Sequence, residues 1–114
     1  MYVVRRVWDA LPGEARRVAS LVAAMGEEYE TAGKRSPSRV YFNTATVPGD
    51  RNRVYMEWTE EVIASPYRDD VVASPSRAQE LYAKVRELTV DSWIEFYELM
   101  TPEKALDVGN AARS

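Results

Sequence analysis

The sequence VYFNTATVPGDRNRVYMEWTEEV, residues 40–62, predicts a β-hairpin, which is the clearest indication of the fold in this chain. Two segments rich in β-branched and aromatic residues flank residues 48–52, whose Pro-Gly-Asp-Arg-Asn sequence is typical of a turn. We therefore expect strands over residues 39–47 and 53–62. Side chains alternate between the two faces of a strand, so the hairpin divides its residues into two sets.

The segment before the hairpin predicts a strand followed by a helix. Residues 3–8 are rich in β-branched and aromatic side chains and end at Asp9, which precedes a Pro-Gly pair. Residues 14–32 place apolar side chains at steps of three and four, the spacing of an amphipathic helix. Gly33 follows as the expected helix-ending glycine.

The segment after the hairpin predicts a second helix and a last strand. The helix is expected to begin near Ser74-Pro75 or at Ser76, which has Gln79 at capping-box spacing. Residues 91–100 are dense in Trp, Ile, Phe and Tyr, which favours a strand. A helical continuation is the alternative, because the aromatic residues of this segment also fit a helical stripe.

The predicted order is β-α-β-β-α-β, a ferredoxin-like α+β fold with an antiparallel sheet. Residues 1–100 form the expected domain and residues 101–114 a C-terminal tail. Both helices would cover one face of the sheet and leave the other bare. A bare face that carries Trp and Tyr must meet something, and a second copy of the sheet would suit it.

Composition narrows the function classes. Hydrophobic residues make up 46% and charged residues 29% of the 114 residues, with a net charge of -3 and no basic block. We expect a soluble globular protein with neither a nucleic-acid nor a membrane partner, and the N-terminus lacks a signal-peptide pattern, which favours the cytoplasm. The chain has no Cys and no His, so thiolate nucleophiles, zinc sites and His-ligated haem are excluded, and no metal or cofactor is expected.

Alternation assigns the strand residues to faces. One set is almost entirely apolar and is expected to pack under the helices: Val40, Phe42, Val54, Met56, Trp58, Ile94 and Phe96. The other mixes rings with polar groups, as ligand pockets do, and is expected on the bare face: Arg6, Trp8, Tyr41, Asn43, Tyr55, Glu57, Trp93, Glu95 and Tyr97. A dry dimer interface is the alternative interpretation of this second set.

The element order, the helix entry PGEA at residues 12–15, the aromatic hairpin and the closing SWIEFYEL at residues 92–99 resemble the dimeric α/β-barrel superfamily. That superfamily includes antibiotic-biosynthesis-type monooxygenases and NIPSNAP-like proteins. The resemblance covers residues 2–100 and implies a homodimeric eight-stranded barrel. It also implies a cavity either between sheet and helices or inside the barrel.

The resemblance implies ligand chemistry at particular positions. The oxygenase branch positions a phenolic substrate with Asn, Trp, Tyr and Arg, and this chain carries Asn43, Trp58, Tyr55 and Arg6 on its predicted strands.

The first functional hypothesis is the binding of a hydrophobic small molecule, such as a polyketide, polyene or fatty acyl chain, in an accessory role in secondary-metabolite biosynthesis. Arg6, Trp8, Tyr41, Asn43, Tyr55, Trp93 and Tyr97 would contact this ligand.

The second hypothesis is a cofactor-independent monooxygenase or cyclase that acts on an aromatic polyketide. Glu57 or Glu95, with a pKa raised by desolvation, would accept the proton of a phenol. A non-catalytic structural homodimer is the third hypothesis.

Overall fold

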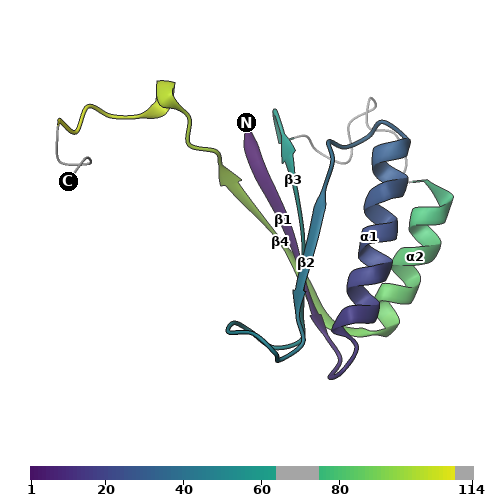
Figure 1. The fold of residues 1–114 in the computed structure, drawn as a ribbon. Coiled ribbons are helices and arrows are strands. Elements are labelled where there is room, and N and C mark those ends of the chain that lie inside the picture. The colour runs from purple at the N-terminus through teal and green to yellow at the C-terminus, as the bar shows by residue number, and fades with distance from the viewer. Residues whose placement is uncertain (64–74, 110–114) are drawn as a thin grey trace.

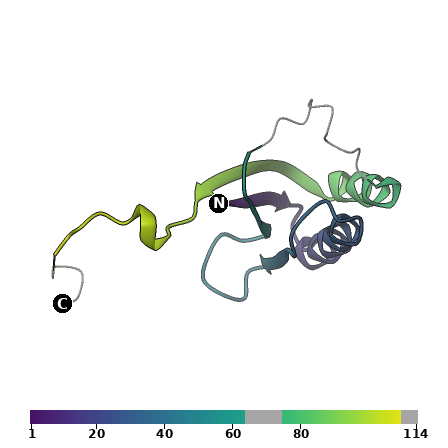
Figure 2. The same ribbon diagram turned by 90° about the horizontal axis from the view of Figure 1, so that it is seen from above.

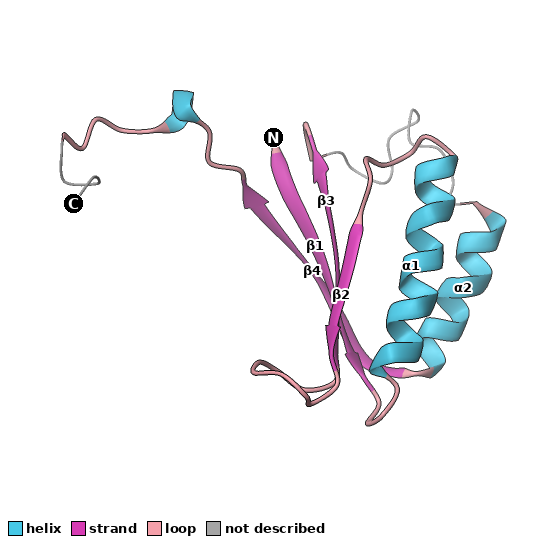
Figure 3. Ribbon diagram, viewed as in Figure 1, coloured by secondary structure: helices cyan, strands magenta, loops and turns pink. Residues whose placement is uncertain are grey.

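The computed structural model describes residues 1–63 and 75–109 of the chain. Figure 1 shows the elements β1 (Tyr2–Ala10), α1 (Ala15–Thr31), β2 (Arg39–Asn43), β3 (Arg53–Glu60), α2 (Ser76–Glu87), β4 (Thr89–Glu98) and the short 3₁₀ helix η1 (Pro102–Lys104). Figure 3 colours the same view by secondary structure. The predicted β-α-β-β-α-β order and the ferredoxin-like α+β class are confirmed.

The four strands form one antiparallel sheet in the order β2-β3-β1-β4. Both helices lie side by side on one face of this sheet, as Figures 1 and 2 show. Neither α1 nor α2 lies on the opposite face. In the register of the strands, even-numbered residues face the helices and odd-numbered residues form this second surface, which we call the open face.

The helix ends follow the sequence signals only in part. Gly33 has a φ of +71°, and the C-cap of α1 is Ala32, so the predicted helix-ending glycine is confirmed. α2 begins at Ser76 after Pro75, but no side chain caps it by a hydrogen bond. The predicted capping box is therefore wrong, because Ser76 lies inside the first helical turn and not before it.

The hairpin turn is wider than expected. β2 ends at Asn43, four residues before the predicted end, because the Asn43 side chain donates a hydrogen bond to the Val47 carbonyl at 2.9 Å. Asn52, at the other end of the turn, adopts a left-handed φ of +58°. The turn therefore begins at the Asn43–Val47 hydrogen bond, inside residues 39–47, which were predicted to be a strand.

The last segment is a strand, and its helical alternative is wrong. β4 pairs along its length with β1, from Tyr2 opposite Glu98 to Asp9 opposite Asp91. It begins at Thr89, two residues before the predicted start. The pairing supplies backbone hydrogen bonds over the entire aromatic run, and the β-branched and aromatic residues suit the pleated surface.

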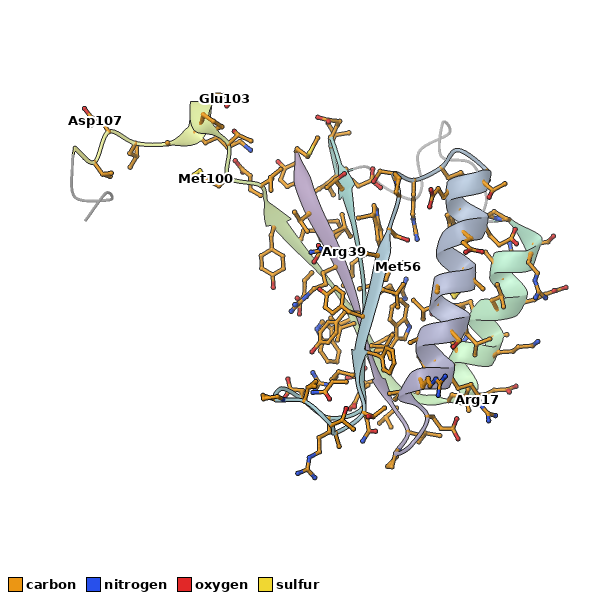
Figure 4. The ribbon with its side chains drawn as sticks, viewed as in Figure 1. Arg17, Arg39, Met56, Met100, Glu103 and Asp107 are labelled. Atoms are coloured by element: carbon orange, nitrogen blue, oxygen red, sulfur yellow. The ribbon has the colours of Figure 1, made fainter. Side chains whose placement is uncertain are left out.

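The core lies between the sheet and the helices. Its buried apolar side chains are Val4, Trp8, Ala10, Ala15, Val18, Ala19, Val22, Met25, Val54, Met56, Trp58, Leu81 and Val85. In Figure 4 the Met56 side chain lies on the helix side of the sheet, and Arg39 lies on the open face. The predicted core positions on β3 are thus confirmed.

The predicted face of Arg6 and Trp8 is wrong. Arg6 lies opposite Met56 and Trp8 opposite Val54, so both side chains point toward the helices. Trp8 is only 1% exposed. The first strand is apolar at both odd and even positions, so alternation within it does not show which set is covered.

Two residues of β4 lie on the expected face without being covered. Ile94 is opposite Arg6 and Phe96 opposite Val4, which places both on the helix side. They remain 46% and 44% exposed, because the helices cover the middle of the sheet and β4 runs past them at its edge (Figure 2).

Beyond β4 the chain extends away from the body of the domain, as Figures 1 and 2 show. Lys104 anchors the start of this extension, since its ammonium donates to the Leu99 carbonyl at 2.8 Å and pairs with Glu98 at 3.3 Å. Leu106 and Val108 farther along are 83% and 58% exposed. Nothing in the described part of the chain covers these two apolar side chains.

A close approach between α1 and the connection to β2 gives a first test of the packing. A Cβ built on Gly26 would lie 2.6 Å from Ser38 Oγ. We expect Gly26→Ala to be neutral or destabilising in the parent chain. In a Ser38→Ala background the obstructing oxygen is gone, and the remaining close atom is the flexible Met56 Cε at 3.3 Å. The same substitution should therefore be more favourable there and, as the thioether shifts, stabilise α1 by up to about 1 kcal/mol through helix propensity. Urea unfolding of the double-mutant cycle measures this; equal effects in both backgrounds would contradict the close contact.

Candidate functional site

A cavity of about 260 Å³ lies between the sheet and the helices. Its lining comes from β1, β3, both helices and the connection after α1: Arg6, Trp8, Met25, Tyr29, Arg35, Met56, Ala78, Gln79 and Tyr82. Three aromatic rings and two thioethers make up most of this lining. Among these lining residues, which all belong to the described ranges, none is acidic and two are arginines.

Arg35 is held between two rings. Its guanidinium carbon lies 3.9 Å from the centre of the Tyr29 ring and 4.1 Å from the Trp58 ring. Burial is the main cause that lowers the pKa of Arg35, and the positive charge of Arg6 acts in the same direction. Cation–π attraction to the rings offsets part of this desolvation cost.

Arg6 approaches the cavity from the sheet. Its guanidinium carbon lies 5.5 Å from the Trp8 ring centre and 5.6 Å from the Tyr82 ring centre. The Arg6 Nε is buried and has no hydrogen-bond partner. A buried donor without a partner costs free energy, so this site would gain from an acceptor in the cavity.

The open face carries a second cluster, centred on Glu95. Its carboxylate accepts hydrogen bonds at 2.8 Å from Arg5 Nε, the Trp93 indole N–H and the Tyr97 hydroxyl. The pKa of Glu95 is lowered, first by the Trp93 hydrogen bond and further by those from Tyr97 and Arg5. The expectation of a raised pKa at Glu95 is therefore wrong, because its neighbours stabilise the charged form more than partial burial opposes it.

The same hydrogen bond acts on its donor in the opposite sense. It raises the pKa of the Tyr97 hydroxyl, because ionisation would remove the proton donated to Glu95. The pKa of Arg5 is raised as well: burial acts to lower it, and hydrogen bonds with Tyr41 and Glu95 outweigh burial. At neutral pH the cluster is thus an ion pair bordered by neutral hydroxyls.

Glu57 forms the neighbouring part of the open face. It accepts the Tyr41 hydroxyl at 3.0 Å and an Arg39 guanidinium nitrogen at 2.9 Å. Tyr41 stacks on Tyr55 with 5.0 Å between ring centres. The pKa of Tyr41 is raised, chiefly by burial. Both glutamates therefore have partners within the chain and do not need a ligand to be satisfied.

The sheet separates the predicted site residues into two groups. Arg6 and Trp8 line the cavity on the helix side. The open face carries the others: Tyr41, Tyr55, Glu57, Trp93, Glu95 and Tyr97. A single ligand cannot contact Arg6 and either glutamate across the backbone of the sheet.

Asn43 lies opposite Arg53 on the open-face side of the sheet, at the end of β2, but its side chain is enclosed by the turn. It is 8% exposed, and its amide nitrogen is used within the turn by the Val47 carbonyl. A Cβ on Gly49 would lie 3.2 Å from the same nitrogen, which shows how closely the turn folds over this side chain. The role that the contacts support is the structure of the turn.

Sequence reasoning missed three residues that the fold brings to these sites. Arg35 lies in the polar connector after α1, and Tyr82 reads as one more apolar position of α2, yet both line the cavity. Arg5, and not Arg6, pairs with Glu95. The adjacent pair Arg5-Arg6 inside an apolar strand was the available signal, since its two side chains must point to opposite faces.

The lowered pKa of Glu95 predicts how the stability of the fold depends on pH. A carboxylate whose folded pKa lies below its ordinary value of 4.5 stabilises the fold above that value and loses the effect as the pH falls through the folded pKa. We expect Glu95→Gln to lose about 1 kcal/mol of unfolding free energy at pH 7, since hydrogen bonds to a charged group are replaced by neutral ones. The difference should shrink as the pH falls below 4.5.

Urea unfolding of both proteins at pH 7 and pH 3.5, at one protein concentration, measures this difference. Glu27→Gln, on the exposed side of α1, is the matched control and should change little at either pH. A loss for Glu95→Gln that stays constant across this range would show that its charge does not stabilise the fold.

Two further properties concern the described residues. Within residues 1–63 and 75–109, no group of three acidic side chains is arranged to hold a metal ion. Neither helix in these ranges is long and apolar enough to span a membrane.

Comparison with known proteins shows the fold alone. No protein-family model and no curated protein matches the chain. Among solved structures, a NIPSNAP family protein from Agrobacterium tumefaciens superposes with a TM-score of 0.61 at 16% identity, covering 89% of this chain and 93% of that one. An antibiotic biosynthesis monooxygenase gives a TM-score of 0.63 at 10% identity, covering 89% and 100%.

A NIPSNAP-like domain protein from Burkholderia xenovorans is 24% identical, with a TM-score of 0.58 over 92% of this chain and 90% of its own. The resemblance expected from the sequence is therefore confirmed for the fold.

Proposed function

We propose that this chain binds a compact hydrophobic small molecule in the cavity between the sheet and the helices. The observation that carries the proposal is the cavity itself, about 260 Å³ in volume and lined mostly by rings and thioethers. Ligand sites are typically concave, largely apolar and supplied with a few placed polar groups. Arg6 and Arg35 are such groups here.

The cavity volume favours some of the expected ligands over others. Sites for drug-sized molecules span roughly 300–1,000 Å³, so this cavity, at about 260 Å³, lies just below that range. A compact aromatic molecule, such as a small aromatic polyketide, fits better than a long polyene or fatty acyl chain. The shared fold with an antibiotic biosynthesis monooxygenase supports an accessory role in secondary-metabolite biosynthesis.

A probe titration and a blocking variant test the proposal. Gln79 is exposed at the rim of the cavity, whereas its neighbour Glu80 is exposed and does not line it. We expect 2-naphthol to bind the parent chain and the Glu80→Trp variant alike, and to bind Gln79→Trp at least tenfold more weakly. Solvent extraction of the purified protein, followed by mass spectrometry, would identify a natural ligand.

Equal binding by both variants would place the ligand elsewhere, and no binding by the parent chain would contradict the proposal. The open face would then be the next surface to examine.

A second candidate is a cofactor-independent monooxygenase or cyclase acting on an aromatic polyketide. The similar fold of the antibiotic biosynthesis monooxygenase favours it. The positions of the glutamates do not, because Glu57 and Glu95 lie on the open face and no described carboxylate lines the cavity. Oxygen consumption with an anthrone-like substrate tests this candidate. Identical rates for Glu57→Gln, Glu95→Gln and the parent chain would remove both glutamates from its mechanism.

We also propose that the chain pairs with a second copy of itself through the open face. The two copies would form the eight-stranded barrel that the resemblance implies. Rings and ion pairs on that face support this partner, since alternating charges and aromatic side chains suit a self-complementary interface. The exposed Tyr97 of β4, on the open face, and the exposed Leu106 of the extension after it would gain cover from the second copy. A dimer whose interface excludes water and whose cavity binds no ligand would support the third hypothesis, a non-catalytic structural homodimer.

A further inference from the structure

The described residues that line the cavity between the sheet and the helices carry an excess of positive charge. Arg6 and Arg35 reach it from different elements, and no acidic residue of the described ranges lines it. Within residues 1–63 and 75–109, no ion pair joins either guanidinium to a carboxylate. Glu60, the carboxylate that influences Arg35 electrostatically, accepts the Trp58 indole N–H at 2.9 Å.

Aromatic rings lie within cation–π distance of the two guanidinium groups. Arg35 lies between Tyr29 and Trp58, and Arg6 lies near Trp8 and Tyr82. The N–H donors of a guanidinium point outward in its plane, so stacking leaves them available for an acceptor. The one acceptor that the described structure supplies to Arg35 is the Met56 sulfur at 3.9 Å, a weak one, and the buried Arg6 Nε has none.

Two positive charges near each other, both partly removed from water, need a compensating negative charge. Each repels the other, and burial has taken away much of the solvent that would screen them. A carboxylate suits this position because its two oxygens match the planar fork of a guanidinium and can accept from both arginines. The surrounding rings would then hold the apolar part of the same molecule.

We propose that the cavity binds a compact aromatic carboxylate, with the carboxylate between Arg6 and Arg35 and the aromatic ring among Trp8, Tyr29 and Tyr82. This inference rests on the proposed function and adds to it the charge of the ligand. The arginine pair acts in recognition and selects an anion over a neutral molecule of the same shape.

A pair of probes that differ in charge and little in shape tests the inference on the parent chain. We expect 2-naphthoate to bind about 10- to 100-fold more tightly than 2-naphthamide, measured by isothermal titration calorimetry at low salt. The advantage of naphthoate should shrink as the salt concentration rises, since added ions compete for the arginines.

Variants of Arg35 locate the effect. Arg35→Met keeps a long apolar stem and should weaken naphthoate binding by about tenfold while it leaves naphthamide binding within about twofold. Arg35→Lys, which keeps the charge, should retain part of the preference. Arg16→Met, exposed on α1 and outside the cavity, is the matched control and should leave both affinities unchanged. Circular dichroism of each variant establishes that it is folded.

The outcomes separate the two proposals. Equal affinity of the parent chain for naphthoate and naphthamide would overturn the anion preference and leave the hydrophobic site standing. Binding of neither probe would overturn both. If Arg35→Met fails to fold, the comparison of the two probes on the parent chain and on Arg6→Met still decides the question.

Discussion

Trp8→Ala is expected to destabilise the fold by about 3–5 kcal/mol, a large part of the roughly 5–15 kcal/mol that stabilises a domain of this kind. Trp8 is 1% exposed and is the largest of the fully buried side chains. Its removal would leave a void between β1 and the helices that neighbouring side chains can fill only in part. Urea unfolding followed by circular dichroism measures the loss as a lower midpoint.

Trp8→Phe is the matched control for this prediction. It keeps an aromatic ring at the same position, so it should cost clearly less than the alanine variant. A loss below about 1 kcal/mol for Trp8→Ala would mean that the side chain lies on the open face, as the sequence pattern predicted, and not in the core.

Tyr97→Glu is expected to convert the proposed homodimer into a monomer. Tyr97 is 52% exposed on the open face and donates to Glu95 at 2.8 Å. A second carboxylate beside Glu95 would remove that hydrogen bond and place like charges where the two open faces meet. Like charges across an interface cost several kcal/mol, so the dimer should weaken by about 100-fold or more.

Sedimentation equilibrium of the full chain measures the assembly. The parent chain should have about twice the chain mass of 13.0 kDa, and the Tyr97→Glu variant should have the chain mass at micromolar concentration. Ala23→Glu, on the exposed side of α1, adds the same charge outside the open face and should remain a dimer. A monomeric parent chain would contradict the barrel; a dimeric Tyr97→Glu variant would place the interface elsewhere.

The strands β3 and β1 show when the alternation of apolar and polar residues predicts which face of a strand is buried. On β3 the even positions from 54 to 58 are Val54, Met56 and Trp58, all apolar, and the odd positions between them are Tyr55 and Glu57. The contrast predicted both faces correctly. On β1 each set holds an arginine and apolar residues, so the pattern within the strand has no contrast, and its phase came from pairing with β3.

The cavity depends on contacts between segments that are distant in the chain. Arg35 reads as part of a solvated connector, and nothing local indicates that Trp58 lies across from it. The turn of the chain after α1 brings the Arg35 guanidinium to 4.1 Å from that ring.

The pKa of Glu95 also depends on neighbours that are fixed by the fold. The hydrogen bonds from Trp93 and Tyr97 lower the pKa of Glu95, whereas burial alone would have raised it.

Sequence patterns alone predicted the element order, the hairpin and the helix end at Gly33, and the composition excluded His and Cys chemistry. These follow from local conformational preference, short-range periodicity and composition, which a single chain segment displays. The tertiary structure decided which face of β1 is buried, which arginine meets Glu95 and on which side of the sheet each site lies. Those depend on the register between strands and on long-range packing, and a shift of one residue in that register exchanges the two faces.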